Sequence, residues 1–94
     1  MKEIIYKGKK IRLPFEGADY GYEFKPNSEN NLDDSPMIEV ANRFSGVKTK
    51  LPAFAVGVYD VIMGSEQFQD WDKHRKGLDW FIEYFPNEYM VLLD

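Results

Sequence analysis

The chain has 94 residues and a net charge of −4; 44% of its residues are hydrophobic, 30% are charged and none is cysteine. A chain of this length folds as one domain that buries roughly 60–65% of its unfolded surface, and this composition excludes wholesale disorder. The absence of cysteine excludes disulfides, thiolate catalysis and cysteine-based zinc sites, and it is compatible with a reducing cytoplasm.

The N-terminal segment and the apolar stretches lead us to expect a cytoplasmic protein without a membrane partner. Residues 1–7 carry charges where a signal peptide needs an apolar run of about 7–15 residues. The longest apolar stretch lies within 53–63 and is well below the ~20 residues of a membrane span.

Residues 1–25 are predicted to form a three-stranded antiparallel sheet, with strands at 3–6, 9–13 and 19–24. Gly8 can adopt the positive φ that a tight turn between the first two strands requires. Ile11 and Leu13 alternate with charged residues, which is typical of a strand with one solvated face. Three strands with an apolar face can be stable where a lone hairpin is marginal.

Residues 26–34 are predicted to be a polar loop, and residues 35–94 a helical region. Ser35 can cap a helix, and Pro36 suits the first helical position. We therefore expect a first helix over 36–45. Its buried face would consist of four apolar residues, Met37, Val40, Ala41 and Phe44.

Pro52 is predicted to open a second helix over 53–63, and its nearly all-apolar composition places it in the middle of the fold. Gly64 would end it, and a third helix would run over 66–84. One stripe of that helix would include Phe68, Trp71, Arg75, Leu78, Phe81 or Ile82, and Phe85.

Two residues interrupt the C-terminal helical pattern. Gly77 costs about 1 kcal/mol relative to alanine inside a helix, so we expect a break or a close helix crossing there. Pro86 marks a boundary, and 87–93 is a short helix or a strand, with helix favoured. The resulting fold class is α+β: a single domain in which a three-stranded sheet packs against three or four helices.

No constellation of catalytic residues is recognisable, so we expect no enzymatic activity, no metal and no cofactor. His74 is the single histidine and lies in a very polar run. Asp70 and His74 share a helical spacing that could supply two metal ligands, but no third ligand is evident. Phosphate-binding glycine motifs are missing. Asp60, the one charge in the apolar helix, fits an exposed stripe, a buried ion pair or a binding site.

The last quarter of the chain is rich in large apolar side chains, and this suggests binding of another protein or of a second copy. Trp80, Tyr84 and Tyr89 are the predicted contact residues, because Trp and Tyr bury area yet keep a polar group for hydrogen bonding. Core packing explains the same residues equally well.

Nucleic-acid binding by the N-terminal hairpin is the alternative function. Lysine and arginine residues placed against phosphates raise affinity, and bases stack on aromatic strand residues. The residues for this function are Lys7, Lys9, Lys10, Arg12, Tyr20 and Tyr22. The same cations would serve equally as the solvated face of an edge hairpin, and the tyrosines as the core face of the sheet.

Three C-terminal segments, 51–64, 76–81 and 85–94, resemble small uncharacterised proteins of tailed phages. They read LPAFAVGVYDVIMG, KGLDWF and FPNEYMVLLD. The resemblance implies a phage or prophage setting and a location in the host cytoplasm. It implies no activity and no functional residues. Taken together, the sequence predicts a small non-enzymatic accessory protein.

Overall fold

The computed structural model describes residues 3–15, 20 and 30–93. It is an α+β fold, as predicted, but with two separate two-stranded antiparallel sheets and three helices. The elements in chain order are β1 (Glu3–Tyr6), β2 (Lys9–Arg12), β3 (Met37–Ala41), β4 (Lys48–Pro52), α1 (Ala53–Gln67), α2 (Trp71–Tyr84) and α3 (Pro86–Leu92).

The first sheet is the predicted N-terminal hairpin. Lys7 and Gly8 both have positive φ, 50° and 80°, which is the two-residue turn that suits a twisted hairpin. The predicted third strand lies outside the described residues except for Tyr20. A second neighbour of β1 is found elsewhere in the chain, because Asn31 forms a parallel bridge with Ile5. The N–H of Ile5 donates to Asn30 O, and its carbonyl accepts from Leu32 N, both at 2.8 Å.

The predicted helix over 36–45 is wrong, because this segment forms β3 and the turn that leads to β4. Ile38 pairs with Leu51, and Val40 pairs with Thr49, in an antiparallel ribbon. The sequence signal for β4 is the alternation of lysines with apolar or β-branched residues over 47–51. The predicted burial of Met37 and Phe44 is also wrong, since 49% and 86% of their surfaces are exposed.

The central apolar helix is confirmed as α1, which begins after Pro52 and buries Phe54, Val58 and Ile62. It continues through Gly64 to Gln67, four residues beyond the predicted end at Met63. Gln69, with a φ of 58°, follows the helix. A C-terminal helix over Pro86–Leu92 is also confirmed.

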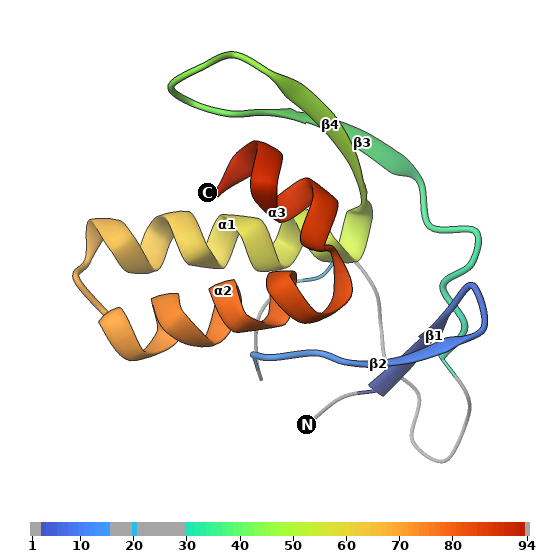
Figure 1. Ribbon diagram of the computed structural model, residues 1–94. Coiled ribbons are helices and arrows are strands. Elements are labelled where there is room, and N and C mark those ends of the chain that lie inside the picture. The colour runs from blue at the N-terminus through green and yellow to red at the C-terminus, as the bar shows by residue number, and fades with distance from the viewer. Residues whose placement is uncertain (1–2, 16–19, 21–29, 94) are drawn as a thin grey trace.

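Figure 1 shows α1 and α2 side by side, with α3 against them and the β3–β4 ribbon arching over α3. The β1–β2 hairpin lies on the other side of the helices. One cluster of buried side chains joins both sheets to all three helices. It includes Ile4, Ile11, Leu51, Phe54, Phe81 and Leu92. In the described part of the chain, no helix is long and apolar enough to cross a membrane.

Gly77 makes the close helix crossing that was one of the two predicted outcomes. It is buried on α2 and faces Ile62 on α1. A Cβ atom at position 77 would overlap Cγ1 of Ile62 and lie 2.8 Å from its Cδ1. The two helices can approach this closely because position 77 has no side chain.

Candidate functional site

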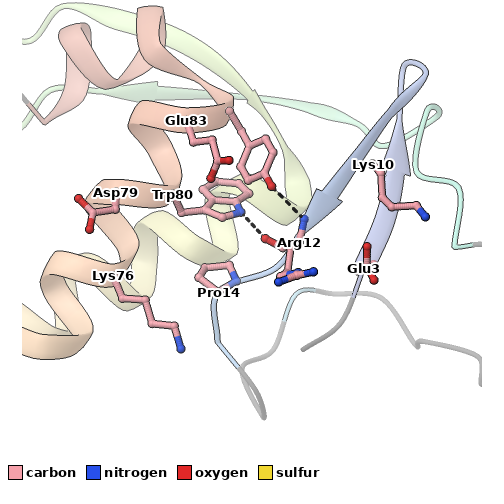
Figure 2. Close-up of a pocket in the computed structure, with 9 residues that line it drawn as sticks. Glu3, Lys10, Arg12, Pro14, Lys76, Asp79, Trp80 and Glu83 are labelled. Atoms are coloured by element: carbon pink, nitrogen blue, oxygen red, sulfur yellow. Dashed lines mark hydrogen bonds between the residues drawn. The ribbon is translucent and has the colours of Figure 1, made fainter.

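Trp80 and Tyr84, two of the predicted contact residues, cover the outer edge of β2. Trp80 is only 4% exposed, and its indole N–H donates to the carbonyl of Arg12 at 2.8 Å. The hydroxyl of Tyr84 accepts a hydrogen bond of 3.4 Å from Arg12 N. Figure 2 shows both bonds between α2 and the strand. These side chains therefore satisfy backbone groups that a sheet edge would otherwise leave open.

Much of the aromatic surplus in the last quarter packs inside the protein. The ring of Trp80 has centroid distances of 5.1 Å to Phe81, 5.5 Å to Phe85 and 6.4 Å to Phe54. Tyr89 is half-buried and packs against the same core. The core interpretation, one of the two that the sequence left open, thus holds for the ring of Trp80.

The predicted cations of the N-terminal hairpin are exposed, but carboxylates surround two of them. Lys10 and Arg12 line a pocket of about 520 Å³ between the hairpin and α2 (Figure 2). The other charged residues that line this pocket are Glu3, Lys76, Asp79 and Glu83. A phosphate backbone placed here would meet three cations and three anions, so this pocket is not a basic channel.

Tyr20 is buried, with 5% of its surface exposed. Its hydroxyl donates to Phe15 O at 2.9 Å and accepts from Phe15 N at 3.2 Å. Burial raises the pKa of Tyr20, and the backbone hydrogen bond partly opposes that rise. This ring is not free to stack on a base. Tyr22 lies outside the described residues.

Among the described residues, the most exposed aromatic side chains are Phe44, Phe68 and Trp71, with 86%, 85% and 57% of their surfaces exposed. Phe44 lies in the turn between β3 and β4, while Phe68 and Trp71 flank the turn between α1 and α2. We call these three residues the aromatic end. The sequence placed Phe44, Phe68 and Trp71 on buried helix faces, and the structure corrects all three.

The turn that carries Phe44 is held by the side chain of Asn42. Asn42 Oδ1 accepts hydrogen bonds from Phe44 N at 2.8 Å and Ser45 N at 3.0 Å. Asn42 Nδ2 donates to Val91 O at 2.8 Å and so attaches the turn to α3. Gly46 completes the turn with a φ of 76°, a conformation that favours glycine.

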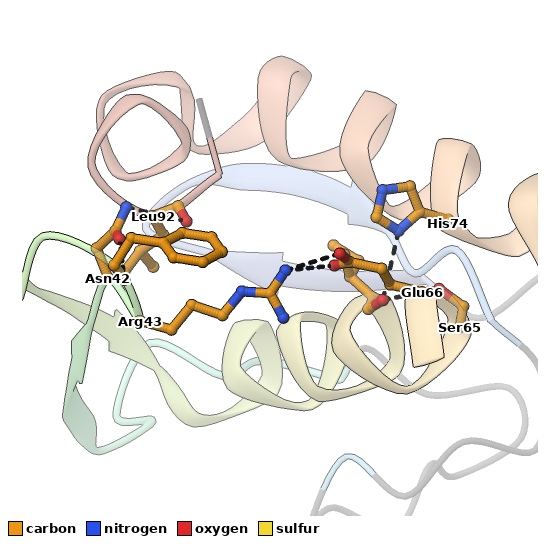
Figure 3. A network of polar contacts seen from close by, with 8 residues as sticks. Asn42, Arg43, Ser65, Glu66, His74 and Leu92 are labelled. Atoms are coloured by element: carbon orange, nitrogen blue, oxygen red, sulfur yellow. Dashed lines mark hydrogen bonds and ion pairs between the residues drawn. The ribbon is translucent and has the colours of Figure 1, made fainter. Parts of the chain in front are cut away.

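Arg43 links this turn to the end of α1. Its guanidinium Nη2 donates to both carboxylate oxygens of Glu66, at 2.7 and 2.8 Å. The same guanidinium lies 4.8 Å from the centroid of the Phe44 ring. Figure 3 shows this bridge between the ribbon and the helix. The ion pair brings Phe44 to the end of the molecule that carries Phe68.

The turn between α1 and α2 is also held by specific bonds. Phe68 N donates to Gly64 O at 3.1 Å, and Asp70 N donates to Ser65 O at 2.8 Å. Asp70 then caps α2, because its carboxylate accepts from Lys73 N at 3.3 Å. Trp71 packs edge-on against His74, with ring centroids 5.6 Å apart. Phe68 and Trp71 thus project from a backbone that is already ordered.

A hollow of about 570 Å³ lies between the ribbon turn and the second half of α1. Its lining residues are Arg43, Asp60, Met63, Gly64, Glu66 and Gln67. Asp60 is exposed and lines this hollow, so the structure contradicts the buried ion pair and leaves the exposed-stripe and binding-site alternatives. The aromatic end therefore borders a recess with both polar and apolar walls.

The described residues contain no group of three or more His, Cys, Asp or Glu side chains that could hold a metal. Asp70, one of the two ligands considered with His74, is a helix cap, and His74 Nδ1 lies 3.4 Å from Ile62 O. Comparison with protein-family models, with curated proteins and with solved structures finds no significant match to this chain.

Proposed function

We propose that this protein acts by binding another protein, and that its contact surface is the aromatic end. The observation that carries the proposal is the exposure of Phe44 and Phe68, at 86% and 85%, together with that of Trp71, at 57%. Burial of a Phe side chain contributes about 1.5–3 kcal/mol relative to its exposure to water. A partner that covered these rings would gain this free energy.

Two further features support a protein partner. Aromatic residues and arginine are enriched among the residues that dominate binding free energy at interfaces, and Arg43 stacks beside Phe44. The bonds of Asn42 and Asp70 hold both turns, so binding would order few additional groups. The nearby hollow offers a recess for a partner side chain.

The proposed surface differs from the one that the sequence suggested. Trp80, Tyr84 and Tyr89 remain predicted contact residues only through the parts of their rings that the core leaves uncovered. The much greater exposure of Phe44, Phe68 and Trp71 supports those three instead. A phage origin and a location in the host cytoplasm stay predictions from the resemblance of the C-terminal segments.

The test is affinity capture from a lysate of the source cells, with three tagged proteins compared by mass spectrometry. These are the wild type, a Phe44→Ser/Phe68→Ser double variant, and an Ile82→Ser/Met90→Ser control that removes exposed apolar side chains from α2 and α3. We expect a stoichiometric protein with the wild type and the control, and its loss with the double variant. Capture that survives Phe44→Ser/Phe68→Ser would contradict the proposal.

Nucleic-acid binding stays the second candidate, because Lys7, Lys9, Lys10 and Arg12 are all exposed on the first hairpin. It predicts binding to single strands that weakens steeply with salt, since the contacts would be with phosphates. A nuclease-treated arm of the same capture separates the two candidates. Partners lost on nuclease treatment would support the hairpin, and those retained would support the aromatic end.

A further inference from the structure

Among the described residues, the outer edge of β3 has no bonded neighbour, whereas each outer edge of the first sheet is bonded at one residue. On β1, Asn30 and Leu32 bond to Ile5, and on β2 the side chains of Trp80 and Tyr84 bond to Arg12. The β3–β4 ribbon forms a sheet of its own, with no third strand among the described residues.

The register shows which backbone groups of the ribbon are open. Asn42 N donates to Val47 O at 2.8 Å, so this pair is hydrogen-bonded and the pairs alternate from there. Val40 and Ile38 are thus bonded to β4. The backbone N–H and C=O groups of the remaining β3 residues point away from β4. Those residues are Met37, Glu39 and Ala41, and in the described part of the chain nothing is bonded to their backbone groups.

The two edges of the ribbon differ in side-chain protection. The outward-bonding residues of β4 include Lys48 and Lys50, and edge lysines discourage pairing with another strand. On β3 the one charge is Glu39, whose carboxylate lies 3.4 Å from Lys48 Nζ of the same ribbon. α3 packs against β4, the strand away from the open edge. α1 also contacts β3, but Met37, Ile38, Glu39 and Ala41 are all exposed. In the described part of the chain, the edge of β3 is therefore accessible and lacks an unpaired charge.

We propose that two copies of this chain associate through antiparallel pairing of β3 with β3. A two-fold axis at Ile38 sets Met37 of each copy against Glu39 of the other as bonded pairs. It also places the two Ile38 side chains opposite each other. An axis at Glu39 would instead oppose two carboxylates, which is unfavourable across strands. The axis at Ile38 covers the large exposed apolar residues of the strand, Met37 at 49% and Ile38 at 40%.

The first test compares proline substitutions on opposite edges of the ribbon. Glu39→Pro removes an outward N–H of β3, and Lys50→Pro removes an outward N–H at its cross-strand partner. Neither substitution removes a β3–β4 hydrogen bond. We would measure the mass of each protein by sedimentation equilibrium at protein concentrations up to the millimolar range, which is roughly the limit of weak association. The wild type and Lys50→Pro should be dimers, and Glu39→Pro should be a monomer. A monomeric wild type, or the same result for both variants, would overturn the proposal.

The second test does not rely on proline and uses the absence of cysteine from the chain. Opposed residues of a non-bonded antiparallel pair have Cα atoms about 4.5 Å apart, which is within disulfide range. Under mild oxidation Ile38→Cys should give a covalent dimer at least tenfold faster than Lys50→Cys. Equal rates, or faster cross-linking of Val40→Cys, would overturn the pairing centred on Ile38. The aromatic end contributes nothing to either readout, so these tests are independent of the proposed function.

Discussion

Gly77 on α2 faces Ile62 on α1 so closely that a Cβ atom at position 77 would overlap the Ile62 side chain and lie 3.3 Å from Cζ of Phe15. The absence of a side chain at this position sets the spacing of the two longest helices. It also gives a prediction that opposes intrinsic helix propensity.

Gly77→Ala should destabilise the protein by about 1–3 kcal/mol, because overpacking costs more than the roughly 1 kcal/mol that alanine gains in a helix. Gly64→Ala is the matched control. A Cβ atom there would meet nothing within 4 Å, so this variant should gain roughly 0.5–1 kcal/mol. Urea denaturation measures both. Equal stabilisation by the two substitutions would show that the helices are further apart than the structure places them.

Trp80→Ala should cost about 3–5 kcal/mol of unfolding free energy, because it removes a buried ring and leaves the carbonyl of Arg12 without its donor. Trp71→Ala should change stability by no more than about 0.5 kcal/mol, since the Trp71 ring is 57% exposed. Thermal unfolding followed by circular dichroism distinguishes the two. A well-folded Trp80→Ala variant that lost only association would restore Trp80 as a contact residue.

Ser35→Ala should lower stability by roughly 0.5–1 kcal/mol, at the low end for a helix cap. Ser35 Oγ accepts from Ala53 N at 3.1 Å, but the same N–H also donates to Pro36 O at 3.0 Å. Ser45→Ala is the comparison, because Ser45 Oγ accepts from Val47 N in an exposed turn. If the two variants have equal denaturation midpoints, Ser35 does not cap α1.

Asn42→Asp should loosen α3 while it leaves the ribbon turn intact. Aspartate keeps the oxygen that accepts from Phe44 N and Ser45 N but loses the donor to Val91 O. The unpaired carbonyl costs about 1–3 kcal/mol. Hydrogen exchange should accelerate at the amides of Tyr89–Leu93 and stay unchanged across β3 and β4. Acceleration in the ribbon instead would mean that the turn depends on the amide group.

The burial of Tyr20 predicts a loss of stability in alkali. Its pKa is raised above the ordinary value of 10.0, with burial as the main cause. The unfolded chain therefore releases this proton first, so stability is unaffected below pH 10 and falls as the pH rises above it. Tyr20→Phe should be less stable at neutral pH, because it loses both bonds to Phe15, and should show a shallower alkaline decline. Parallel pH profiles for the two proteins would contradict the shift.

Local signals predicted several elements correctly. The positive φ of Gly8 follows from a two-residue hairpin turn, and Pro52 followed by a nearly all-apolar run is sufficient to locate the start of α1. The boundary at Pro86 likewise follows from a restriction that proline imposes on its own neighbours. These features depend on residues that are adjacent in the chain, so no tertiary information is needed to find them.

The segment from Ser35 to Gly46 shows where local signals mislead. Ser35-Pro36 reads as a helix start, and the hydroxyl of Ser35 does accept from the first N–H of a helix, but that helix is α1, which begins 18 positions later. The spacing of Met37, Val40, Ala41 and Phe44 fits a helix, yet 37–41 pairs with 48–52. Strand pairing between separated segments outweighed the helical pattern.

The sequence by itself determined the fold class, the central apolar helix and the first hairpin, because each of these depends on composition or on neighbouring residues. At the C-terminus it favoured a helix over a strand without deciding between them. Only the tertiary structure decided which aromatic rings are core and which are surface. Trp80 is buried because the carbonyl of Arg12, far away in the chain, accepts its indole N–H. Phe44 and Phe68 are exposed because the ribbon turn and the helix turn carry them away from the core formed by the described residues. Burial depends on which distant segments meet, and hydrophobicity alone does not encode that.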